Sequence, residues 1–152
     1  MRIEMTYDRL GSRLRTIGPV TINYNLLGAR PSQVGSWSLS YDRLGARLRT
    51  VGPYQLNYDR LGSRVSSVGA WTCEYDMLGA RLRVLGPYQL TYDHLGSRIH
   101  TIGALTLEYD RLGSRACAVE LPPGASGLTD DDVFALFLTH VLTEQARERS
   151  RS

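Results

Sequence analysis

The sequence predicts an all-β tandem-repeat domain followed by one C-terminal α-helix. Three observations support this fold class: a tyrosine recurs every 17 residues from Tyr7 to Tyr109, strict apolar–polar alternation precedes each tyrosine, and glycines mark two turns in each unit. Repeats of short fixed period stack so that neighbouring units build the core together. We therefore expect seven strand–turn–strand units arranged as a β-solenoid or as a two-layer stack of hairpins.

The chain divides into three parts by composition. Residues 1–121 hold the seven-unit β-repeat domain, residues 122–128 form a linker rich in Pro and Gly, and residues 129–152 form an amphipathic helix with a basic tail. At 152 residues, the chain is long enough to bury one modest core.

The longer strand of each unit ends at the repeated tyrosine. In the third unit Trp37, Leu39 and Tyr41 share one parity, and polar Ser38 and Ser40 stand between them. This period of two is typical of a strand that is buried on one face. The same pattern precedes every other repeated tyrosine.

A shorter strand follows the motif. In "RLRTIG" (13–18) the apolar residues Leu14 and Ile17 are three apart, which breaks the alternation. One extra residue in a β-bulge beside the turn explains this spacing.

Two turns separate the strands of a unit. "DRLG" places Asp first and Gly fourth, as type I turns prefer. In "GPY" and "GAW" (52–54 and 69–71) the glycine supplies unusual backbone dihedrals, and in the first of them Pro fixes the next residue.

Successive units are not identical, because a 34-residue period lies over the 17-residue one. Odd units read "GPYQL" (52–56) where even units read "GAWTC" (69–73). Either successive units lie on opposite walls of a flattened stack, or a 34-residue ancestor was duplicated without structural meaning. We favour opposite walls.

The motif "YDRLGSRLRTIG" (7–18) resembles the YD repeat of RHS-type proteins, whose units carry Tyr-Asp, two further residues and then Gly with Arg. The likeness covers residues 1 to about 119. It implies antiparallel hairpins that wind into a curved sheet, and it suggests carbohydrate-associated or wall-associated roles. The units here are shorter than that family's, which are usually nearer twenty residues, and seven of them are too few for a shell that encloses cargo.

The motif residues are expected to be architectural. In the fourth unit we expect a structural ladder of Tyr58, Asp59 and Arg64, in which the guanidinium bridges the carboxylate or backbone carbonyls, or stacks on tyrosine, and ties adjacent units together. An anion-binding row of arginines is the alternative. Leu61 belongs to the same ladder, because a leucine that recurs within a turn must be buried by a neighbouring layer. The second unit has Asn25 in place of Asp, which favours a turn-forming role over a metal site.

The C-terminal segment predicts a helix. Thr129 is a suitable N-cap, and the acidic residues 130–132 suit the positive end of the helix dipole. The apolar residues that we assign to helix-mediated oligomerisation are Phe134, Phe137, Leu138 and Val141. The helix either caps the open end of the stack or joins copies of the chain.

Composition excludes several function classes. All 18 basic residues are arginine, and the net charge of +3 is too small and too evenly mixed to indicate a nucleic-acid partner. No apolar run is long enough to predict a membrane span, and the first repeat begins too early to leave room for a secretory signal. Cys73 and Cys117 are too few for a disulfide framework, so a reducing, cytoplasmic setting fits.

No catalytic constellation, cofactor site or metal site recurs in the units. We therefore expect a non-enzymatic structural scaffold that self-assembles into a homo-oligomer through repeat edges or the helix. The alternative is a small lectin-like module that binds a carbohydrate or another ligand through aromatic residues at the starts of strands. Those residues are Trp37, Tyr54, Trp71 and Tyr88.

Overall fold

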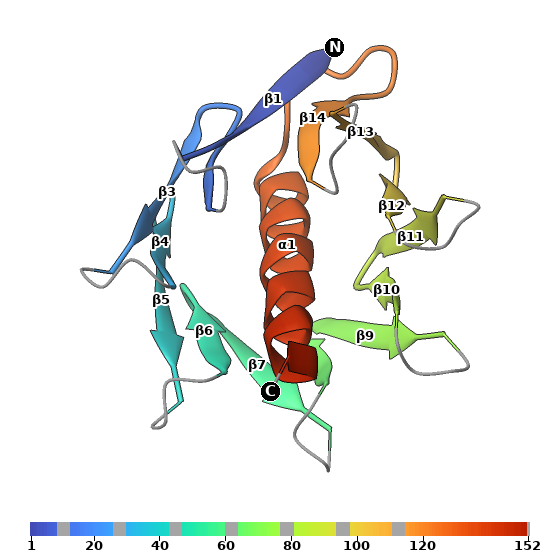
Figure 1. Cartoon of the computed structure of the whole chain (residues 1–152). Helices are drawn as coiled ribbons and strands as arrows, with labels where there is room; N and C mark the ends of the chain where they lie inside the picture. The colour runs from blue at the N-terminus through green and yellow to red at the C-terminus, as the bar shows by residue number, and fades with distance from the viewer. Residues whose placement is uncertain are drawn as a thin grey trace.

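The strands of the repeat region close into a single ring, and the C-terminal helix lies inside it (Figure 1). The computed structural model describes residues 1–8, 13–25, 30–42, 47–59, 64–76, 81–93, 98–110 and 115–151, with side chains up to residue 146. The motif turns at 9–12 and the equivalent positions, with Leu61 and the other turn leucines, lie outside these ranges. The expected type I turn and the burial of its leucine therefore stay predictions.

Fourteen strands follow one another along the chain, and β1 to β13 alternate between long and short. They are β1 (Arg2–Tyr7), β2 (Leu14–Ile17), β3 (Val20–Tyr24), β4 (Pro31–Val34), β5 (Trp37–Tyr41), β6 (Leu48–Val51), β7 (Tyr54–Tyr58), β8 (Val65–Val68), β9 (Trp71–Tyr75), β10 (Leu82–Leu85), β11 (Tyr88–Tyr92), β12 (Ile99–Ile102), β13 (Leu105–Tyr109) and β14 (Ala116–Glu120). The helix α1 spans Asp130–Arg151. The prediction of an all-β repeat with one C-terminal helix is confirmed.

The predicted arrangement as a solenoid or a two-layer stack is wrong, because the sheet closes on itself. Each strand pairs antiparallel with the next, and β1 pairs with β14 through Ile3 and Val119. All units therefore share one wall, and the opposite walls that we favoured for odd and even units do not occur. Closure gives every described strand two neighbours and removes the free edges of the sheet.

Tight turns and bulges appear where the sequence predicts them. Seven of the described glycines have positive φ angles, and six of them, such as Gly18 (φ 56°), are each the first residue of a two-residue connection such as Ile17 to Val20. Positive φ at this first position is typical of a type II′ hairpin turn. The register shifts between Thr6 and Tyr7 and at the same place in the other units, which confirms the bulge beside the motif turn.

The apolar face of the sheet points into the ring. Most middle residues of long strands and most end residues of short strands are buried, including Leu14, Ile17, Leu56 and Val68, whereas Leu39 in the middle of β5 is half-buried. Polar residues face outward and pair across strands, as Thr6 and Thr16 do with hydroxyls 2.6 Å apart. This alternation places the core on the ring axis, where α1 lies.

The helix fills an interior that the strands cannot fill alone. Eight-stranded barrels are packed with their own side chains, whereas barrels of sixteen or more leave a channel. A ring of fourteen strands leaves room for a helix of about 10–12 Å diameter. Val133 to Thr139 are all buried, around the whole circumference of the helix. The helix is thus the centre of the core, a placement that differs from both the end cap and the intermolecular helix considered above.

The start of α1 is fixed by a capping box. The Asp132 backbone N–H donates to Thr129 Oγ1 (3.0 Å), and the Thr129 N–H donates to Asp132 Oδ2 (3.0 Å). These reciprocal bonds satisfy two otherwise unpaired donors at the helix N-terminus. The predicted N-cap at Thr129 is confirmed.

Candidate functional site

An aromatic socket on the inner wall of the ring holds Phe134 of α1. The Phe134 ring lies 5.2 Å from Trp37, 5.0 Å from Tyr54 and 5.2 Å from Trp71, measured between ring centroids. These separations fall in the range of favourable aromatic pairs. Phe134 itself is only 3 % exposed. The socket therefore fixes one helix residue from three directions.

Strand position and turn geometry place these aromatic rings. Trp37, Tyr54 and Trp71 are the first residues of β5, β7 and β9, and each covers the tight-turn glycine of the following unit. A Cβ at Gly52 would lie 2.5 Å from the Trp37 ring, and one at Gly86 would lie 2.3 Å from the Trp71 ring. These glycines are thus required for space as well as for their positive φ angles.

Tyr88 extends the socket to the start of the helix. Its ring lies 5.6 Å from Trp71, and its hydroxyl donates to Asp132 Oδ1 over 2.6 Å. Burial, followed by the Asp132 carboxylate, raises the pKa of Tyr88 well above its usual range. The phenol therefore stays a donor at neutral pH and anchors the capped end of α1.

The four residues predicted to bind a ligand are thus neighbours in the structure, and three of them surround the chain's own helix. Tyr54 is the most exposed of them, at 38 %. The residues predicted to mediate oligomerisation, Phe134, Phe137, Leu138 and Val141, are 3, 1, 0 and 9 % exposed and pack in this same core. As long as α1 stays inside its ring, these four side chains are not an available surface.

A second repeated arrangement ties the units together at the other end of the ring. Asp59 and Arg64 form an ion pair inside one unit, with Nε 3.1 Å from Oδ2. The Arg64 guanidinium lies 4.7 Å from the ring centroid of Tyr75, in the next unit, and the Tyr75 hydroxyl donates back to the Val65 carbonyl (2.9 Å). The Asp–Arg pair thus stays within a unit, and the contact between units is made by arginine and tyrosine.

The same contact closes the ring. Arg115 lies 4.7 Å over the Tyr7 ring, and the Tyr7 hydroxyl donates to the Ala116 carbonyl over 2.9 Å. The seven arginines and seven tyrosines therefore form one continuous circle. Burial raises the pKa of Tyr7, Tyr24, Tyr75 and Tyr92 to about 12, which keeps their hydroxyls protonated as donors.

Two helix residues that the sequence did not single out complete the contacts with this circle. The Leu48 backbone N–H donates to Gln145 Oε1 (3.1 Å), and Gln145 Nε2 donates to the Tyr58 hydroxyl (3.3 Å). His140 packs against Tyr7 with ring centroids 6.3 Å apart. Neither residue belongs to the apolar stripe, so the sequence pattern carries no signal for these two contacts.

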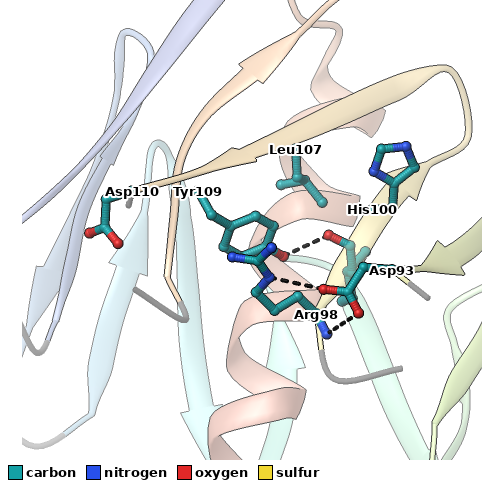
Figure 2. A pocket seen from close by; sticks show the side chains of 7 residues that line it. Asp93, Arg98, His100, Leu107, Tyr109 and Asp110 are labelled. Atoms are coloured by element: carbon teal, nitrogen blue, oxygen red, sulfur yellow. Dashed lines mark hydrogen bonds and ion pairs between the residues drawn. The ribbon is translucent and has the colours of Figure 1, made fainter. Parts of the chain in front are cut away.

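A polar hollow of about 310 Å³ lies between the sixth and seventh units (Figure 2). Arg98 crosses it, paired with Asp93 (3.0 Å) and lying 4.7 Å from the Tyr109 ring centroid. His100 and Asp110 also line it and are exposed. The charged groups at its centre are thus already bonded to each other, so the hollow offers a polar surface rather than an activated acid or base.

The two cysteines are further candidates for reactive chemistry. Cys73 and Cys117 are free thiols, and burial raises the pKa of Cys73 to about 11, which makes it a weak nucleophile. Over the described residues, no three His, Cys, Asp or Glu side chains gather closely enough to hold a metal ion. In the part of the chain that the structure describes, no helix is both long enough and apolar enough to cross a membrane.

Comparisons with known protein families, with curated proteins and with solved structures find no match to this chain.

Proposed function

We propose that this protein is a non-enzymatic structural scaffold: a closed β-ring of seven units that holds an α-helix along its interior. The observation that carries the proposal is the burial of Val133 to Thr139 on all sides of the helix. A helix that is apolar around its whole circumference needs a surrounding wall. The aromatic socket around Phe134 and the bond between Tyr88 and Asp132 give that helix a defined register in the ring.

The contacts of the helix resemble those of a peptide ligand in a groove. An apolar middle section packs on the wall, and polar contacts at the two ends, through Asp132 and Gln145, set its orientation. Helix recognition by proteins commonly combines apolar anchors with a few orienting bonds. The scaffold would thus serve to hold or present a helix.

Self-assembly stays part of the proposal in a narrower form. Each described strand is already paired on both sides, so assembly would use exchange of α1 between rings rather than added strands. The carbohydrate-binding alternative has weaker support, because the Trp37 and Trp71 rings lie against Phe134. The resemblance to YD repeats agrees with a curved sheet of hairpins and leaves the partner of the scaffold open.

A cleavable linker tests the proposal in the full-length chain. Gly124 is exposed, and no atom lies within 4 Å of a Cβ built on it, so a protease site inserted after it should be tolerated. After cleavage under native conditions we expect the helix fragment to co-elute with the ring in gel filtration. Phe134→Ala in the cleaved protein should release the fragment, because it empties the aromatic socket.

Two results would count against this role. If the helix fragment separates while the ring keeps its strand signal in circular dichroism, the ring does not depend on the helix. If light scattering of the uncut protein gives a mass that grows with concentration far above 17.0 kDa, open self-assembly is the better description. A stable dimer that exchanges tagged helices would instead support α1 exchange between rings.

A further inference from the structure

One pair of neighbouring strands, β1 and β14, is joined differently from the rest of the described ring. The strands follow one another around the ring in sequence order, so the other neighbours are joined by short connections such as Ile17 to Val20. β1 and β14 are held only by contacts between them, in a ladder that pairs Ile3 with Val119. We call this pair of strands the seam. Because a connecting turn keeps two strands together at one end, the seam is the place where the ring can open fully without unfolding a hairpin.

The arginine that crosses the seam is less constrained than most of its equivalents. In five units an Asp orients the motif Arg, with Nε 2.5–3.1 Å from Oδ2. Arg115 lies 4.7 Å over the Tyr7 ring, but among the described residues no ion pair joins it to Asp110, which is exposed. The backbone bond that closes the other motif turns, such as Asp93 N–H to the Arg98 carbonyl (2.9 Å), is also not formed between Asp110 and Arg115.

The helix needs such an opening to leave its position. Val133 to Thr139 are buried on all sides. Sliding of α1 along its own axis would carry Phe137 and Leu138, which are 1 and 0 % exposed, past wall side chains that are packed around other residues. Interiors are packed too densely for large side chains to pass one another without separation of the elements. Separation of β1 from β14 widens the wall and leaves every hairpin intact.

We propose that the seam is a lateral gate through which α1 leaves and re-enters the ring. The proposal rests on the helix-holding role given above and adds the route that the helix takes. Opening breaks the seam ladder, the bond from the Leu121 N–H to the Met1 carbonyl (2.8 Å) and the bond from the Tyr7 hydroxyl to the Ala116 carbonyl (2.9 Å). Such partial opening costs less than global unfolding.

Two engineered disulfides that share one cysteine test the gate. Ala118 is the Cα partner of Glu4 in β1 and of Glu108 in β13. Ala118→Cys can therefore be combined with Glu4→Cys across the seam, or with Glu108→Cys inside a hairpin as the matched control. Directly opposed residues of antiparallel strands lie within reach of a disulfide. In both variants the two native cysteines are replaced by alanine, and each oxidised protein is compared with its own reduced form.

Hydrogen exchange in the uncut protein measures how often the helix is exposed. Oxidation of the seam pair should slow the amides of Val133 to Thr139 at least tenfold more than those of β7, which lies across the ring from the seam (Figure 1). The β7 amides are the reference, because a disulfide that only stabilises the whole fold slows both sets equally. Oxidation of the hairpin pair should slow both sets alike. The gate is refuted if the seam disulfide also slows both sets alike.

Exchange of the cleaved helix gives a second measurement. With the linker cut after Gly124, tagged and untagged proteins are mixed, and the appearance of tagged helix on untagged rings gives the rate of release. The seam disulfide should slow this release at least ten times more than the hairpin disulfide does, and equal effects would count against the gate. A cut helix that does not co-elute with its ring contradicts the holding role instead, and the hydrogen exchange of the uncut protein then still decides the route.

Discussion

The replacement of Phe134 by alanine tests the central role of the helix most directly. Phe134 is 3 % exposed and lies 5.0–5.2 Å from three aromatic rings of the wall. Truncation of a buried Phe to Ala typically costs about 3–5 kcal/mol. With three aromatic pairs of roughly 0.5–1.5 kcal/mol each also lost, we expect the upper half of that range. A domain with a total stability of about 5–15 kcal/mol would be left only marginally stable.

The protein carries its own reporter for this experiment. Its two tryptophans, Trp37 and Trp71, both contact the Phe134 ring, so their fluorescence follows the docking of α1. Urea unfolding monitored by tryptophan emission and by circular dichroism gives the free energy of unfolding from two probes. Phe134→Leu is the matched control. It keeps most of the apolar volume and should cost about 1–2 kcal/mol through the lost ring contacts.

The reasoning fails on a specific pattern of results. If Phe134→Ala lowers the free energy of unfolding by less than about 1 kcal/mol and leaves the tryptophan emission of the folded protein unchanged, Phe134 does not occupy the socket. In that case α1 would not form the centre of the core.

Three further predictions follow from the same geometry. Tyr58→Phe removes the hydroxyl that donates to the Leu48 carbonyl (2.7 Å). This substitution should lower the free energy of unfolding, measured by urea titration, by about 1–2 kcal/mol. A change below about 0.3 kcal/mol would show that this hydrogen bond between units does not stabilise the fold. Gly86→Ala should destabilise the fold by more than about 2 kcal/mol, because its Cβ would lie 2.3 Å from the Trp71 ring at a φ of 57°. Gly124→Ala, with a φ of 89° but nothing within 4 Å, should cost about 1 kcal/mol; equal costs for the two substitutions would refute the steric part of this argument. Burial raises the pKa of Tyr24 and Tyr75 from 10.0 to about 12, so the stability from this burial is complete below pH 10 and is lost as the pH rises toward 12. Alkaline titration followed by tyrosinate absorbance and circular dichroism should show ionisation of these residues together with unfolding, and ionisation near pH 10 in a folded protein would contradict the assignment.

The local structure could be predicted from the sequence because each signal is carried by a few neighbouring residues. Alternation in Trp37, Leu39 and Tyr41 shows which strand face is buried, and the three-residue spacing of Leu14 and Ile17 shows the bulge. Glycine at a hairpin turn similarly indicates a position where the backbone needs a positive φ angle. Each of these features depends on interactions within one unit.

The closure of the ring could not be predicted in this way. It depends on the small rotation from one unit to the next, which no residue pattern within a unit specifies. The position of the helix depends in turn on closure, because only a closed ring has an interior to fill. The contacts of Arg64 could not be assigned from the sequence either. Arg64 pairs with Asp59 inside its unit and packs on Tyr75 of the next unit, and this choice depends on which strand lies beside each loop. For the same reason, the sequence predicts the aromatic residues of the socket as one set, but it does not predict that Phe134 of α1 packs against them.

The odd number of units has a consequence at the place where the first and last strands of the ring meet. A two-unit alternation can continue without a fault around a circle only if the number of units is even. With seven units, the seventh and the first are both of the odd type, so one mismatch is unavoidable, and it falls where β14 meets β1. Two ion pairs lie at this junction: the Met1 ammonium is 2.7 Å from Glu120, and the Arg2 side chain is 3.0 Å from Glu108. The break in the two-unit alternation thus coincides with the pair of neighbouring strands that are furthest apart in the sequence, β1 and β14.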